Sequence, residues 1–140
     1  MRNAIFWPLI AQVLLVGLVA GRMYAKRIGE LKARRIRPQA LATSRSAAET
    51  LQDIAAADNF RNLFEVPVLF FALGCALAIT DTVTPLQVGL AWTYVALRAA
   101  HSFIHVTYNR VMHRFAVYAA STALILVMWA LFAWSLWRAG

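Results

Sequence analysis

Four long apolar stretches, separated by short polar ones, limit what this chain can fold into. They cover approximately residues 4–23, 60–79, 86–106 and 115–137. Each is long enough to cross a hydrocarbon core of about 30 Å, which needs roughly 20 helical residues. With 140 residues, of which 61% are hydrophobic and 14% charged, little remains to build a soluble domain. We therefore predict an all-α integral membrane protein whose residues 1–140 form one domain, a four-helix transmembrane bundle.

The net charge of +8 is concentrated on one side of the predicted membrane. Most of the basic residues lie at the end of the first stretch and in the connection after it: Arg22, Lys26, Arg27, Lys32, Arg34, Arg35, Arg37 and Arg45. The connection between the third and fourth stretches adds Arg110 and Arg114, whereas the connection over residues 80–85 carries only Asp81. The positive-inside rule places the two basic connections in the cytoplasm and both termini on the opposite side.

Aromatic residues agree with this topology. Trp7, Trp134 and Trp137 all fall on the predicted outer side, where an interfacial aromatic belt would lie. The basic connection is then explained by topology and by attraction to anionic lipid, at about 1 kcal/mol per cation near the surface. We expect membrane lipid, and not nucleic acid, to be the partner of this charge.

Two local signals describe the second stretch. Ser46-Ala-Ala-Glu49 is a capping-box pattern, which predicts a helix that begins near Ala47 and continues into the membrane. Pro67 lies inside this helix and removes one backbone hydrogen bond, so we expect a kink or local unwinding there.

Polar side chains inside the second and third stretches are the main functional signal, because charged residues in a span are costly and usually functional. Asp58, Arg61, Asn62 and Glu65 follow the spacing i, i+3, i+4, i+7 of one helical stripe. On the third helix, Arg98, His101 and His105 follow i, i+3, i+7, with Ser102, Tyr108 and Asn109 nearby. The spacing predicts two facing stripes with an Arg98–Glu65 pair between them.

Several uses of this cluster are open. It could be a buried network that only holds helices together. The excess of arginines over acids favours instead a carboxylate-bearing or otherwise anionic ligand, because Arg binds carboxylates bidentately. His101 and His105 could ligate a metal, but further ligands are lacking unless Glu65 joins them, so we expect none. The same three residues also allow a small proton-coupled transporter, although the chain lacks the paired broken helices of such proteins.

The motifs themselves resemble a known family. Asn62-Leu-Phe-Glu65-Val-Pro67, followed by Arg98-Ala-Ala-His101-Ser-Phe-Ile-His105, is similar to sequences of the MAPEG superfamily of membrane proteins in eicosanoid and glutathione metabolism. The strings from Asp58 to Glu65 and from His105 to Arg110 look typical of its bacterial branch. The resemblance extends over nearly the whole chain and includes the basic first connection and the proline in the second helix. It implies a bacterial inner membrane protein whose termini are periplasmic and whose basic connection is cytoplasmic.

The resemblance also implies a homotrimer that binds glutathione, as co-substrate, between neighbouring subunits near the cytoplasmic side. Asn62, Glu65 and Arg98 match positions that contact glutathione in the family. His101 and His105 stand where tyrosines occur in leukotriene synthase, and we add Arg61 and Tyr108 to the candidate binding residues. The family's catalytic arginine, which stabilises the thiolate, would fall near Met112, so Arg110 or Arg114 would have to replace it.

Two functions follow from this resemblance. The first is a microsomal-type glutathione transferase or peroxidase that acts on a lipophilic electrophile, with the thiolate stabilised by arginines at a subunit interface. The alternative is a non-enzymatic lipid-binding or scaffolding membrane protein of the same fold. Asp58, where the family commonly has an arginine, and the two histidines motivate this alternative.

Overall fold

The computed structural model describes residues 2–52 and 54–139, and these residues contain helices but no strand. The elements are, in order, η1 (Arg2–Ile5), α1 (Phe6–Ala33), η2 (Pro38–Leu41), α2 (Ser44–Thr50), α3 (Ala55–Asn62), α4 (Pro67–Ile79), α5 (Pro85–Val106) and α6 (Val111–Ala139). The all-α prediction is therefore confirmed.

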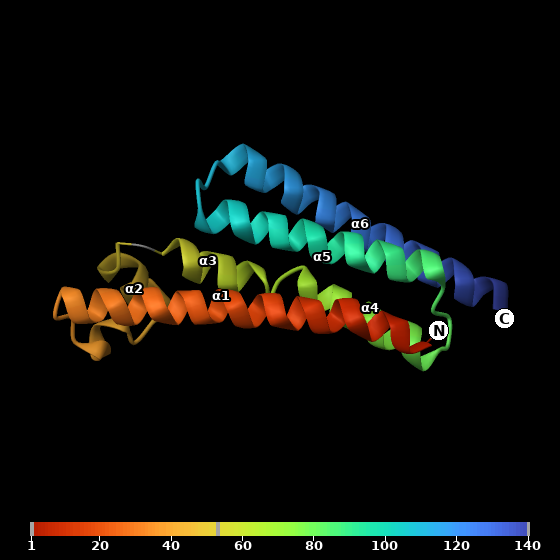
Figure 1. Ribbon diagram of the computed structural model, residues 1–140, viewed down its shortest axis with the longest axis horizontal. Helices are drawn as coiled ribbons and strands as arrows, with labels where there is room; N and C mark the ends of the chain where they lie inside the picture. Colours follow the sequence, from red (N-terminus) through yellow and green to blue (C-terminus); the bar gives the residue numbers. More distant parts are fainter. Residues whose placement is uncertain (1, 53, 140) are drawn as a thin grey trace.

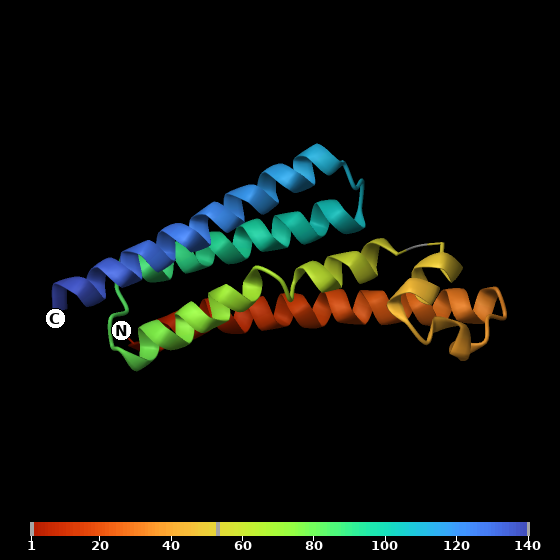
Figure 2. The same ribbon diagram turned by 180° about the vertical axis from the view of Figure 1, so that it is seen from behind.

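The long helices lie side by side along one axis. In Figures 1 and 2, α3 and α4 follow each other along α1, and α5 pairs with α6. Both termini lie at the end where α4 connects to α5, which we call the terminal end. The basic connection with α2, and the α5–α6 connection, lie towards the opposite, basic end. The two basic connections thus share a side of the molecule, as the charge pattern requires.

Three helical segments are long and apolar enough to cross a membrane: Arg2–Ala33, Ala55–Ile79 and Val111–Ala139. The fourth predicted span corresponds to α5, which has the length but a more polar composition. Its polar side chains, including Gln87, Arg98 and His101, are buried against the neighbouring helices. The crossing of the membrane by α5, and with it the four-span bundle, remains a prediction.

The hydrophobic core lies near the terminal end, where buried side chains of η1, α1, α4, α5 and α6 meet. Leu73, Leu77, Ala91 and Ile125 are completely buried there. Tyr94 stacks on Phe70 with ring centroids 4.5 Å apart. This apolar packing joins α5 to α6 and holds α4 and the start of α1 against the pair, and so determines which residues of α5 reach the basic end.

The second predicted span breaks where the proline required it. α3 ends at Asn62, residues 63–66 form turns, and Pro67 is the first residue of α4. Proline has no N–H to donate and its ring hinders the preceding turn, so it is well suited to begin a helix and poorly suited to continue one. The expected local unwinding is confirmed.

The start of this region differs from the prediction. Thr43, not Ser46, caps α2: the Thr43 side chain accepts from the Ser46 N–H, and the Ser46 hydroxyl bonds the Thr43 backbone in return. The helix then ends at Thr50, because Leu51 is extended with ψ 143°. The predicted continuous helix from Ala47 into the membrane is therefore wrong.

Candidate functional site

A cavity of about 180 Å³ lies between the α3–α4 break and the α5–α6 pair, towards the basic end. It is lined by Asn62, Glu65, His101, Val111, Arg114, Phe115 and Tyr118. The cavity thus combines a carboxylate, a guanidinium, an amide and an imidazole group with an apolar wall from α6. Four of the seven lining residues belong to the sequence-predicted site.

Arg98 is fully buried beside this cavity. Its Nη2 donates to the backbone carbonyl of Asn62 at 2.9 Å. Its guanidinium carbon lies 5.6 Å from the centroid of the Tyr118 ring, a cation–π geometry. The Nε and Nη1 groups are buried and have no hydrogen-bond partner among the described residues. Donors left in this state cost free energy unless a ligand, water or another chain accepts from them.

The predicted pair between Arg98 and Glu65 is not formed, because no ion pair joins these two described residues. The helix break is the reason. In a continuous helix, Glu65 would lie on the same stripe as Asn62. The turns at 63–66 displace Glu65 from this stripe and leave its side chain exposed. The same break frees the Asn62 carbonyl from helical bonding, and Arg98 bonds to this oxygen instead.

Both histidines contact Arg114, which lies in the first turn of α6. His101 Nδ1 lies 3.3 Å from the Arg114 backbone oxygen. Arg114 Nη1 lies 3.2 Å from His105 Nε2 and donates to Asn109 Oδ1 at 2.7 Å. Asn109 adopts a left-handed conformation with φ 46°, which asparagine tolerates well and which turns the chain into α6. Arg114, and not Arg110, is thereby brought to the cavity.

Three predicted site residues lie elsewhere. Arg61 is on another face of α3, where it pairs with Asp58 at 3.7 Å. Tyr108 is exposed, and its hydroxyl lies 3.4 Å from His113 Nδ1. Arg110 is also exposed and does not line the cavity. We predicted that the stripe from Asp58 to Glu65 lies on one face of a helix, but the structure divides these residues between two faces.

Sequence reasoning missed the part that α6 contributes. Val111, Phe115 and Tyr118 line the cavity together with Arg114. These four positions follow i, i+3, i+4, i+7, the same stripe spacing used for the second span, so the signal was present but was attributed to an ordinary apolar span. A second missed feature is the buried bond from Ser102 Oγ to Asn59 Oδ1 at 3.2 Å, which joins α5 to α3.

A second hollow, the α1/α3 groove, lies on the opposite side of α3 and measures about 410 Å³. Its lining residues are Met23, Tyr24, Arg27, Ser44, Ala57, Phe60, Arg61 and Phe64. The groove holds two arginines beside aromatic rings. Arg27 Nε is buried in it without a hydrogen-bond partner among the described residues.

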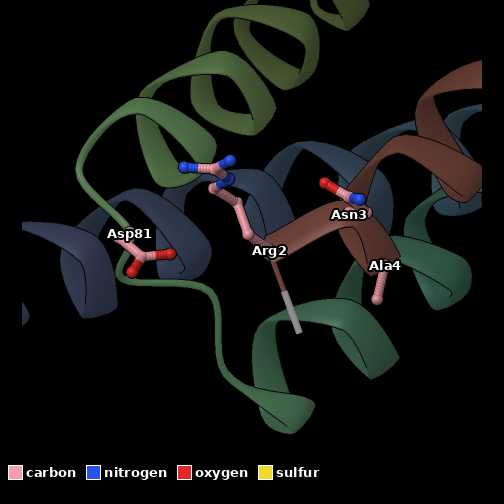
Figure 3. A pocket seen from close by; sticks show the side chains of 4 residues that line it. All are labelled: Arg2, Asn3, Ala4 and Asp81. Atoms are coloured by element: carbon pink, nitrogen blue, oxygen red, sulfur yellow. The ribbon is translucent and has the colours of Figure 1, made fainter.

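A third hollow, of about 390 Å³, lies at the terminal end and is lined by Arg2, Asn3, Ala4 and Asp81 (Figure 3). It is far along the helices from the polar cluster and contains none of the predicted site residues. We therefore assign the candidate site to the cavity at the basic end.

The donor set of this cavity suits an organic zwitterion better than a metal ion. Among the described residues, no group of three or more His, Cys, Asp or Glu side chains could hold a metal. Arg114 can bind a carboxylate or stabilise a thiolate, and Glu65 can accept from an ammonium group.

Comparison with known proteins gives one informative result. No curated protein and no solved structure gives a significant match to the chain. The model of the MAPEG family, however, matches residues 4–134 of the 140. The match covers three of the four apolar stretches and most of the fourth, the helix break and every residue of the cavity, and it confirms the resemblance to the MAPEG superfamily drawn from the motifs. The chain belongs to the MAPEG family.

Proposed function

We propose that this protein is a glutathione-dependent membrane transferase or peroxidase that acts on a lipophilic electrophile. The MAPEG family includes glutathione transferases and peroxidases, and its members commonly use glutathione. The observation that carries the proposal is the cavity itself, in which Glu65 and Arg114 provide opposite charges beside Asn62 and His101. Glutathione is a peptide with one ammonium group and two carboxylates, so both signs of charge have a counterpart.

Unpartnered polar atoms support a polar ligand. His101 Nε2 in the lining of the cavity, and Nε and Nη1 of Arg98 beside the cavity, are buried without partners among the described residues. Two are donors, whereas His101 Nε2 is an acceptor if its Nδ1 donates to the Arg114 carbonyl. A peptide carries both carboxylates and N–H groups, and could therefore satisfy both kinds of atom.

The size of the cavity supports assembly as a homotrimer. At about 180 Å³ it is smaller than the roughly 300 Å³ of a usual small-molecule site. A ring of subunits uses two different faces of each chain. The α1/α3 groove, with Arg27 and Arg61, is a second cationic surface, on the side of α3 away from the cavity. In the proposed ring, this groove faces the cavity of the next subunit and completes the glutathione site.

In the proposed reaction, the Arg114 guanidinium lies beside the glutathione sulfur. A nearby positive charge favours the charged form of a thiol, so it lowers the pKa of the bound thiol and increases the fraction of nucleophilic thiolate. The apolar wall of Phe115 and Val111 lies next to this charge and is exposed on the outer side of α6. A lipophilic electrophile would enter from the bilayer along this wall.

The proposed topology puts the site on the cytoplasmic side. The basic connection lies at the same end of the molecule as the cavity, and the positive-inside rule assigns that end to the cytoplasm. Both termini are then periplasmic, in a bacterial inner membrane. This arrangement gives the site direct access to cytoplasmic glutathione.

The test is to purify the full chain in detergent and to measure two signals with millimolar glutathione. We expect a thiolate absorbance band and conjugation with a hydrophobic electrophile, both lost in Arg114→Gln. No glutathione binding at this concentration would contradict the proposal. If Arg98→Ala and Glu65→Gln abolish trimer assembly while the wild type shows no turnover, the protein is instead a lipid-binding or scaffolding member of the family.

A further inference from the structure

Two histidines one turn apart hold a single arginine. His101 and His105 are 2% and 3% exposed on α5, and their rings lie 5.8 Å apart. One contacts the backbone oxygen of Arg114 at 3.3 Å and the other its side chain at 3.2 Å. Asn109 adds a third contact: its Oδ1 accepts at 2.7 Å from Arg114 Nη1, the side-chain atom that also contacts His105. We call these three residues the arginine clamp.

The chemistry of the partners determines where the protons are. A guanidinium has only donors, so His105 Nε2 must accept from Arg114 Nη1. The neutral imidazole of His105 therefore carries its proton on Nδ1. A carbonyl has only acceptors, so His101 Nδ1 must donate to the Arg114 oxygen. The clamp exists only while His105 is neutral, because an imidazolium would direct a second N–H at the guanidinium.

We propose that His101 and His105 are positioning residues that hold the Arg114 guanidinium in the cavity, and that protonation of His105 releases it. The inference rests on the proposed role of Arg114 at the glutathione thiol.

The groups around His105 oppose one another. On α5 its neighbour is His101, and in the α5–α6 connection and α6 it faces Asn109 and Arg114. The carboxylate of Asp58 on α3 is the acidic group whose charge reaches it. Arg114 thus places a positive charge and Asp58 a negative charge near the ring.

On α1, Arg22 donates to the carbonyl of Val106, next to His105 in the chain, at 3.1 Å. Because the contact with Arg114 needs an unprotonated Nε2, acid acts directly on the contact that holds Arg114.

The first experiment needs no glutathione. Nitrogen-15 NMR of histidine-labelled protein in detergent, with His105→Gln used for assignment, reports which ring nitrogen of His105 carries the proton. We expect the Nδ1–H form near neutral pH, and a shift towards Nε2–H in Arg114→Gln. The matched control, Arg110→Gln, removes an exposed arginine from the same connection and should leave the signal unchanged. An Nε2–H form in the wild type, or no response to Arg114→Gln, would overturn the clamp.

The second experiment measures the bound thiolate between about pH 4 and about pH 8, a range that extends well to the acid side of an unperturbed histidine. In the wild type, acid should protonate both the thiol and His105, so the thiolate should fall more steeply than a one-proton curve. His105→Gln keeps an acceptor but cannot titrate, so the thiolate of this variant should follow a one-proton curve. His105→Phe removes the acceptor and should lose thiolate on the order of tenfold at all pH values, as for one hydrogen bond to a charged group.

His113→Gln, which removes an exposed histidine from the same region, should retain the steep wild-type curve. Identical pH curves for the wild type and His105→Gln would refute the release step. Absence of a thiolate band in the wild type at every pH would refute the proposed function, while the NMR result would still decide whether the clamp exists.

Discussion

Replacing Arg98 with methionine tests whether this arginine is a binding residue or a structural one. The variant loses one hydrogen bond to the Asn62 carbonyl, about 2 kcal/mol for a charged donor. It also loses the contact with the Tyr118 ring, about 1 kcal/mol. Against this, it removes two buried donors without partners among the described residues, at about 2 kcal/mol each. The ligand-free variant should therefore be about 1 kcal/mol more stable than the wild type.

Reversible unfolding in mixed micelles with dodecyl sulfate, followed by circular dichroism, measures this difference. Glutathione at 100 times its dissociation constant should stabilise the wild type by about 2.7 kcal/mol and the variant by much less. Arg110→Met is the matched control and should change stability by less than about 0.5 kcal/mol, because Arg110 is exposed. A loss of about 3 kcal/mol or more in ligand-free Arg98→Met would refute the reasoning, since it would mean that Nε and Nη1 are satisfied without a ligand.

Further substitutions test the packing around the site by the same unfolding measurement. Gly74→Ala should cost about 1–3 kcal/mol, since its Cβ would lie 2.6 Å from a leucine methyl group of α1. Gly17→Ala, with nothing within 4 Å, should be neutral or slightly stabilising, and an equal loss in both would contradict the packing. Arg22→Met should cost about 1 kcal/mol by uncapping the end of α5, and no loss in low salt would contradict this role. Ser102→Ala should cost about 1–3 kcal/mol by leaving Asn59 unpaired in the core, whereas a neutral result would require another partner for the amide.

The fold was predictable where local sequence decides it. Long apolar stretches identify three segments that are long and apolar enough to cross a membrane, and Pro67 marks the break between α3 and α4 because its effect on the backbone is local. The extended residue Leu51, which separates α2 from α3, carries no such signal. Next to it, the side chain of Arg34, the residue that follows α1, donates to the Thr50 carbonyl at 2.8 Å, and such distant contacts are not visible in a local pattern.

The site was predictable on α5 and not on α3. α5 is one continuous helix, so the spacing of Arg98, His101 and His105 correctly placed all three on a buried face. The same rule failed for Glu65, because helical spacing has no meaning across a broken helix. Tyr118 was overlooked for a different reason: an aromatic residue in an apolar span has no distinguishing feature until its neighbours are known.

In the predicted four-span bundle, the polarity of α5 has a consequence for how the protein is made. An arginine near the centre of a span adds about 2.5–3.5 kcal/mol to the free energy of insertion, and the two histidines add to this cost. α4 is strongly apolar and is joined to α5 by only the residues 80–84. We expect the translocon to release the two as a helical hairpin, in which the α3–α4 segment already offers the Asn62 carbonyl to Arg98. The partner of the arginine is thus synthesised before the arginine itself.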